Sequence, residues 1–191
     1  MPRRRLRAYE VVCEALRLVG RDDVADEIII GGPLTGEVAR LNRAGLTYLN
    51  AVRDELARGY FPLDAKEEMS SKNGSFAFAD FKYKPYEIKR VIADGKPVKW
   101  HISPDYLVAD GKNITVFYTY VPDPLKMDDE FDYPVFAVSE RLVEYGIAAE
   151  YYLVLGDVTN SAVWESKYRS EIENLLSRSG LKGRIPPRRW I

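Results

Sequence analysis

The two side chains that most often supply a nucleophile and a base near neutral pH each occur once, as Cys13 and His101. A cysteine–histidine pair supports nucleophilic catalysis when the fold holds the two within hydrogen-bonding reach. Cys13 follows Val11 and Val12 in a predicted helix, and His101 follows Trp100 in a predicted strand. No feature of the sequence brings these two elements together. We therefore expect Cys13 to be a small buried side chain and His101 to be a strand residue without a catalytic role.

Metal and phosphate sites lack the side chains that they need. A zinc site takes three or four ligands, mostly Cys and His, whereas the chain has two such residues in all. The run Asp128, Asp129, Glu130 and Asp132 lacks the alternation and the central glycine of a calcium loop, which predicts a solvated acidic linker. The glycine-rich segment 31–36 lacks the Gly-Lys-Ser/Thr ending of a phosphate loop. The 29 acidic residues always offer carboxylate pairs for glycoside cleavage, but none stands out. We expect no catalytic residue, no metal and no cofactor, and hence a protein that is not an enzyme.

Charge is distributed unevenly along a chain whose formal net charge is only −1. Four arginines fall in the first seven residues, and Lys182, Arg184, Arg188 and Arg189 fall in the last eleven. Removing these eight from the 28 basic residues leaves 20 against 29 acidic ones. Because DNA binding needs Lys and Arg gathered on a surface that contacts phosphates, an acidic body disfavours it. The basic ends either keep the protein soluble or seek an acidic neighbour.

The composition also bounds the compartment. No apolar run approaches the roughly 20 residues that span a bilayer, so we expect no membrane partner. Glu10 and Glu14 stand where a secretory signal would carry its apolar stretch. A single cysteine excludes an internal disulfide, and cytoplasmic production fits best.

Apolar residues recur at spacings of three and four in two N-terminal segments, which is typical of helices. The first segment predicts a helix over about 7–19 that stops at Gly20, followed by a short helical piece through Glu27. The second predicts a helix over about 36–58, roughly 34 Å long, that stops at Gly59. Its apolar stripe is Val38, Leu41, Gly45, Leu49, Val52 and Leu56.

Between residues 60 and 122 the spacing changes to the alternation of strands. Asp94-Gly95 predicts a two-residue hairpin turn, because both positions tolerate a positive φ. A second such pair, Asp110-Gly111, precedes the strongest strand, 114–121, whose two apolar faces both look covered. Pro122 ends a predicted antiparallel meander of five or six strands.

Helical spacing returns after an acidic linker at 123–133. One stripe runs from Val138 to Tyr152 and a second, over about 160–177, consists of Trp164, Tyr168, Ile172 and Leu175. Neither helical half carries enough apolar surface for its own core, which favours one bundle over two domains in series. We predict an α+β protein: about four bundled helices from 1–59 and 123–180, a β-rich insertion at 60–122, and a basic docking tail at 181–191.

Several short patterns carry a resemblance to a known family. They are Phe117-Tyr118-Thr119-Tyr120-Val121-Pro122, Ala148-Ala149-Glu150-Tyr151-Tyr152, Trp164-Glu165-Ser166-Lys167-Tyr168 and Arg188-Arg189-Trp190. With this order of elements, the chain resembles the head-to-tail connector (adaptor) proteins of tailed bacteriophages and prophages. The resemblance covers the domain order over most of the chain and residue patterns over about the last 75 residues. The long β insertion departs from the smallest, all-helical members.

The resemblance implies a structural virion protein of the neck. Such a protein forms a homo-oligomeric ring, commonly of twelve copies, beneath the portal protein and leads DNA to downstream tail or stopper proteins without binding it specifically. A tail that folds on docking suits such a contact. We expect the C-terminus to anchor to the portal, with an aromatic side chain in a pocket and arginines paired with acids. The expected docking residues are Arg184, Arg188, Arg189, Trp190 and Ile191.

Two other functions stay open. A stopper or tail-completion protein would bind the tail instead of the portal. A small enzyme, or a ligand- or carbohydrate-binding module, would present aromatic residues such as Trp100, Tyr106 and Tyr118 on one exposed sheet face. Burial of these aromatic residues against helices would favour assembly instead.

Overall fold

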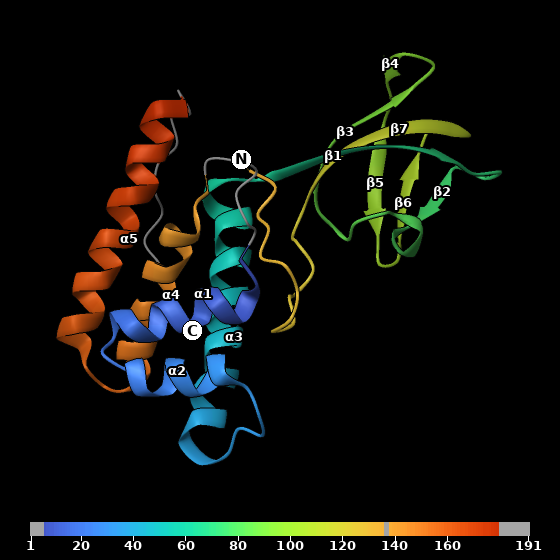
Figure 1. Cartoon of the computed structure of the whole chain (residues 1–191). Helices are drawn as coiled ribbons and strands as arrows, with labels where there is room; N and C mark the ends of the chain where they lie inside the picture. Colours follow the sequence, from blue (N-terminus) through green and yellow to red (C-terminus); the bar gives the residue numbers. More distant parts are fainter. Residues whose placement is uncertain (1–5, 136–137, 180–191) are drawn as a thin grey trace, which may run out of the picture. The chain divides into compact units, whose positions relative to one another are not determined.

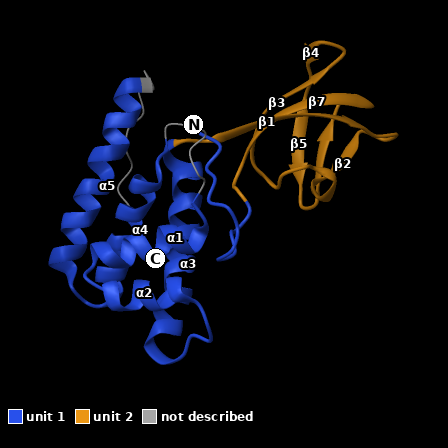
Figure 2. Cartoon of the chain, viewed as in Figure 1, with its two compact units in different colours: residues 1–60, 123–191 blue, residues 61–122 orange. Residues whose placement is uncertain are grey.

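The computed structural model describes residues 6–135 and 138–179. The chain divides into two compact units (Figure 2). Residues 1–60 and 123–191 form a helical unit, and residues 61–122 form a β-rich unit that is inserted in it along the chain. Within the described ranges there are five α-helices and seven strands, so the predicted α+β class is confirmed.

The helical unit is built around α4. The α-helices are α1 (Ala8–Leu18), α2 (Asp22–Ile30), α3 (Gly36–Glu55), α4 (Glu140–Val154) and α5 (Val158–Ser179). Helix α4 packs against α1, α3 and α5 (Figure 1). Its apolar stripe is completely buried at Leu142 and Ile147, as are Val12 and Leu16 of α1 and Tyr168 of α5. No helix in the described ranges is long and apolar enough to cross a membrane.

Two glycines let these helices approach closely. A Cβ atom built on Gly45 of α3 would overlap the Tyr151 hydroxyl of α4 and a methyl group of Val12 on α1. A Cβ atom on Gly146 of α4 would lie 2.8 Å from Val52 of α3. The close contact between α1, α3 and α4 therefore depends on having glycine, which has no Cβ atom, at both positions.

Two helices differ from the sequence prediction. Helix α2 continues to Ile30, because Val24 and Ala25 pack into the core and no helix-breaking residue comes before Gly31. Helix α3 ends at Glu55 and passes into a π-helical turn, Leu56–Tyr60. This turn keeps Leu56 and Tyr60 buried.

The β-rich unit consists of two antiparallel sheets that share one core. The strands are β1 (Leu63–Ser70), β2 (Ser75–Ala77), β3 (Pro85–Ala93), β4 (Lys96–Pro97), β5 (Trp100–Ser103), β6 (Tyr106–Ala109) and β7 (Asn113–Tyr120). Their orders are β1-β7-β3-β4 and β2-β6-β5. Phe76 and Leu107 from the smaller sheet pack with Val91, Val116 and Tyr118 from the larger one.

The predicted Asp94-Gly95 hairpin is confirmed. Both residues have positive φ, 48° and 75°, and Ala93 pairs with Lys96 across the turn. Positive φ at both central positions gives the turn a twist that matches the twist of the strands.

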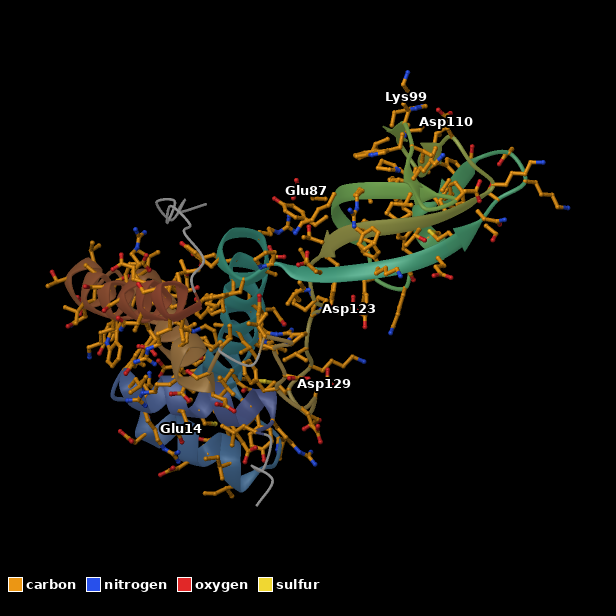
Figure 3. All side chains as sticks on the ribbon, turned by 90° about the horizontal axis from the view of Figure 1, so that it is seen from above. Glu14, Glu87, Lys99, Asp110, Asp123 and Asp129 are labelled. Carbon is orange, nitrogen blue, oxygen red and sulfur yellow. The ribbon has the colours of Figure 1, made fainter. Side chains whose placement is uncertain are left out.

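The predicted simple meander is wrong. Strand β6 pairs with β5 and β2, whereas β7 pairs with β1 and β3, so Asp110-Gly111 carries the chain from one sheet to the other. The amide of Asp110 donates to the Lys99 carbonyl at 3.1 Å, and both residues lie at one end of this unit (Figure 3). Gly111 passes so close to β3 that a Cβ atom on it would lie 2.9 Å from that of Ala93.

The acidic linker has exposed acidic side chains, two buried aromatic ones, Phe131 and Tyr133, and an anchored backbone. Arg53 of α3 is only 4% exposed and donates to the carbonyls of Asp123 and Asp132, at 3.0 and 3.3 Å. Asn50 exchanges two hydrogen bonds with the backbone of Leu125. Asp123 and Asp129, labelled in Figure 3, are exposed, and the Asp129 carboxylate accepts a hydrogen bond from the Lys126 amide at 2.7 Å. Solvated acids were expected here, but the buried arginine that holds the segment was not.

Candidate interaction site

A groove of about 770 Å³ runs along one flank of α5 in the helical unit. We call it the α5 groove and define it by Leu153, Val158, Ala162, Glu165, Ser166 and Glu173. Five of these residues lie on α5 at spacings of four, three, one and seven, which places them on one face of the helix. Only Leu153 comes from α4.

The polar side chains of Ser161 and Glu165 in the groove are held in place by hydrogen bonds within and between the helices. Ser161 is buried and donates to the Ala149 carbonyl at 3.0 Å, which ties α5 to α4. Glu165 is 9% exposed and accepts a hydrogen bond from Arg169 at 2.6 Å. This bond raises the pKa of the Arg169 guanidinium. The small side chains of Ala162 and Ser166 lie between these residues and leave the groove hollow.

Exposed apolar side chains gather at two helix ends. Val154 and Leu155 follow each other at the end of α4 and are 65% and 53% exposed. Ile29 and Ile30 end α2 and are 48% and 83% exposed. Single exposed apolar residues are common on soluble proteins, whereas adjacent ones mark contact surfaces more often. We call these two pairs the apolar helix ends.

The β-rich unit carries an aromatic ring between two cations on its outer sheet face. Phe117 on β7 pairs across strands with Lys66 on β1 and Arg90 on β3. The Arg90 guanidinium lies 4.4 Å from the ring centre and the Lys66 ammonium lies 6.0 Å from it. Beside them, Lys89 forms an ion pair with Asp64 at 2.7 Å. Phe117 is only half-buried, so the expectation that both faces of this strand are covered was wrong for this position.

The three aromatic residues considered for ligand binding do not form one exposed platform. Tyr118 is 1% exposed inside the core of the β-rich unit, and its hydroxyl donates to Glu67 at 2.8 Å. Burial and this bond raise the pKa of Tyr118. Trp100 packs partly against the same core, and only Tyr106 is well exposed. These residues pack on the sheets of their own unit.

Cys13 and His101 are placed in different units. Cys13 is completely buried on α1, and its thiol donates to the Ala25 carbonyl at 3.6 Å. Burial raises the pKa of this thiol to about 11, which leaves almost no thiolate at neutral pH. His101 is exposed on β5.

Of the other segments considered as binding sites, one is a loop that connects two helices and one lies outside the described residues. Segment 31–36 joins α2 to α3, and a helix rather than a strand precedes it, so it lacks the strand–loop–helix frame of a phosphate site. Across 6–135 and 138–179, no three His, Cys, Asp or Glu residues gather closely enough to hold a metal ion. The predicted docking residues, Arg184, Arg188, Arg189, Trp190 and Ile191, lie outside the described residues.

The sequence did not predict the α5 groove, the apolar helix ends or the row formed by Lys66, Phe117 and Arg90 across three strands. Apart from Leu153 and Val158, the α5 groove is lined by small and charged residues whose pattern is that of an ordinary solvent-exposed helix face. Ile29 and Ile30 were visible as an apolar run, but the helix was expected to stop before them.

No protein-family model matches this chain, and no curated protein matches it either.

Proposed function

We propose that the chain is a structural, ring-forming head-to-tail connector of a tailed bacteriophage or prophage, placed beneath the portal and leading DNA toward the tail. The proposal combines the resemblance of the sequence with an α+β architecture in which the β insertion lies, along the sequence, between the two helical segments of one unit. The observation that carries it is the pair of apolar helix ends, Ile29-Ile30 and Val154-Leu155.

These two surfaces fit a ring contact because they are different from each other. A ring is closed by a heterologous interface, in which one surface of a subunit meets another surface of its neighbour. Covering one exposed isoleucine stabilises such a contact by about 1.5–3 kcal/mol. We propose that the end of α2 in one copy and the end of α4 in the next contribute to this interface.

The charge of the chain agrees with a passage for DNA. Without its eight terminal cations the chain has 20 basic and 29 acidic residues. A lumen made by such a body repels phosphates, so DNA can move through it without being held. The basic C-terminal tail is proposed to reach the portal through Arg184, Arg188, Arg189, Trp190 and Ile191.

The ring is tested with surface variants of the full-length protein. Ile30→Glu and Leu155→Glu are expected to abolish oligomers in native mass spectrometry and negative-stain microscopy, with an unchanged helical circular dichroism spectrum. Lys72→Glu, at an exposed position of the β-rich unit, is the matched control and should leave the oligomers intact. A wild-type chain that stays strictly monomeric, alone and with a portal, would refute the connector.

Portal docking is tested separately. Deleting residues 182–191 should abolish co-sedimentation with portal rings and leave the fold unchanged. Undiminished docking of the deleted chain would exclude the tail as the anchor. Binding to tail proteins with no binding to portal would instead identify a stopper or tail-completion protein.

A further inference from the structure

We propose that, in the free chain, the α5 groove binds the chain's own C-terminal segment, residues 180–191. The groove is a hollow of about 770 Å³ beside a helix whose last residue, Ser179, immediately precedes this segment. The size is within the range of about 300–1,000 Å³ that ligand pockets take. The inference does not depend on the connector function.

The length of the segment matches the length of the groove. The groove residues of α5 run from Val158 to Glu173, 15 residues apart, which corresponds to about 23 Å along the helix axis. Trp190 lies 11 residues beyond Ser179, a reach of about 34 Å in a polyproline II conformation and at most about 36–40 Å in a fully extended chain. If about three residues reverse the chain, the other eight still span ~25 Å and bring Trp190 to the level of Ala162.

The sequence of the segment favours such a path. Gly180 and Gly183 can adopt the backbone angles that reverse a chain after a helix. Pro186-Pro187 then favours an extended conformation with little entropy left to lose. An extended strip of this kind fits a shallow groove without forming secondary structure of its own.

The order of charged and apolar residues along the segment matches the order of charged and apolar residues along the groove. The segment carries Lys182, Arg184, Arg188 and Arg189 and no acidic residue. The part of the groove nearest Ser179 bears the exposed carboxylate of Glu173, and the one lining cation, Arg169, is paired with Glu165. The far part is lined by Leu153 and Val158. An antiparallel path therefore sets the first cations beside the acid and the apolar Trp190 and Ile191 beside the apolar lining. Docking on any other partner then requires the segment to leave the groove.

A cross-linking experiment tests the position of the segment. The full chain carries Ile191→Cys with Ala162→Cys in the groove, or Ile191→Cys with Lys167→Cys on the opposite flank of α5 as the control. Both helix positions are exposed, and the natural Cys13 is buried and unreactive. With a short bis-maleimide, an intramolecular cross-link is expected for the groove pair, about tenfold more than for the control pair. Equal cross-linking of the two pairs overturns the proposal. A covalent dimer as the main product also overturns it, because the segment then binds another copy.

A proteolysis experiment tests the same contact without new cysteines. The segment has tryptic sites after Lys182, Arg184, Arg188 and Arg189, and the proposal predicts that the last two are cleaved only while the segment is free. Val158→Arg places a cation in the groove, and Val163→Arg is the control, because Val163 is also exposed but does not line the groove. Because cleavage follows the population of the open form, Val158→Arg should accelerate it about tenfold over wild type, and Val163→Arg should not. Equal rates in both variants overturn the proposal. This test fails or succeeds independently of any ring or portal.

Discussion

Adding one methyl group to Gly45 should damage the helical unit more than its size suggests. The new Cβ atom of Gly45→Ala would overlap the Tyr151 hydroxyl and a methyl group of Val12. Neither neighbour can retreat easily: Val12 is completely buried, and Tyr151 is 2% exposed and donates to the Leu41 carbonyl at 2.8 Å. The helices must therefore separate, or Tyr151 must give up its hydrogen bond.

The magnitude follows from three opposing contributions. Overpacking a core costs about 1–3 kcal/mol. Losing a buried hydrogen bond and leaving its carbonyl unsatisfied costs about 1–3 kcal/mol more. The higher helix propensity of alanine returns about 1 kcal/mol. We expect Gly45→Ala to lower the free energy of unfolding by about 1–5 kcal/mol, which corresponds to a Tm roughly 2–20 °C lower.

Circular dichroism at the helical minimum during urea and thermal unfolding measures this change in the helical unit. Gly59→Ala is the matched control, because a Cβ atom on Gly59 meets nothing within 4 Å. It should change stability by less than about 1 kcal/mol. In a double-mutant cycle, Tyr151→Phe removes one of the two clashing atoms and should recover about 1 kcal/mol of the Gly45→Ala loss. If Gly45→Ala unfolds at the same temperature as Gly59→Ala, the packing of α1, α3 and α4 around Gly45 is refuted.

Three further predictions concern buried polar groups. Arg53→Met should destabilise the chain by about 2–3 kcal/mol and speed amide exchange over residues 123–133, because two carbonyls lose a charged donor; unchanged exchange there would contradict the anchor. Burial raises the pKa of Glu144; Glu14 and Glu140 add to this effect and Arg141 opposes it. The carboxyl group of Glu144 therefore has a higher pKa in the folded chain than in the unfolded chain. The wild-type protein therefore loses stability as pH rises and Glu144 must ionise in its buried site, whereas glutamine stays neutral. The Tm of Glu144→Gln minus the Tm of wild type should grow from pH 4 to pH 8, and a constant difference would refute this. Cys13 should react with a thiol reagent at pH 8 roughly 100-fold or more slowly in the folded chain than in urea, since burial raises its pKa to about 11; equal rates would mean an open α1.

The helices were predictable because burial repeats at the helical period. The first predicted helix, 7–19, is observed at Ala8–Leu18, and the last, 160–177, at Val158–Ser179. Tyr168 and Ile172, which were placed on the inner face of the last helix, are completely buried. Each of these stripes needs only local spacing to be recognised.

Strand β1 was not predicted because half of its residues are charged. Leu63–Ser70 alternates, but three of its members are acidic and one is lysine, a composition that disfavours strands. It forms because all eight of its residues pair with β7, from Leu63 opposite Tyr120 to Ser70 opposite Asn113. A pairing over about 50 residues of sequence leaves no local signal, and so the Lys66–Phe117–Arg90 row that depends on it was also missed.

The α5 groove was missed for a related reason, and this explains why the interaction surface is harder to predict than the fold. A stripe that enters the core is apolar because it is always buried, whereas a surface that binds a segment only part of the time must remain soluble when it is empty. Small and charged residues such as Ala162, Ser166 and Glu173 keep the empty groove soluble. Their spacing along the helix is the same as that of an ordinary solvent-exposed face, so the sequence does not distinguish the two. What distinguishes them is that Leu153 on α4 lies beside the N-terminal part of α5, which only the packed pair of helices reveals. The basic segment 180–191 was already prominent in the sequence; the structure adds a surface of fitting length and charge on the helix that it follows.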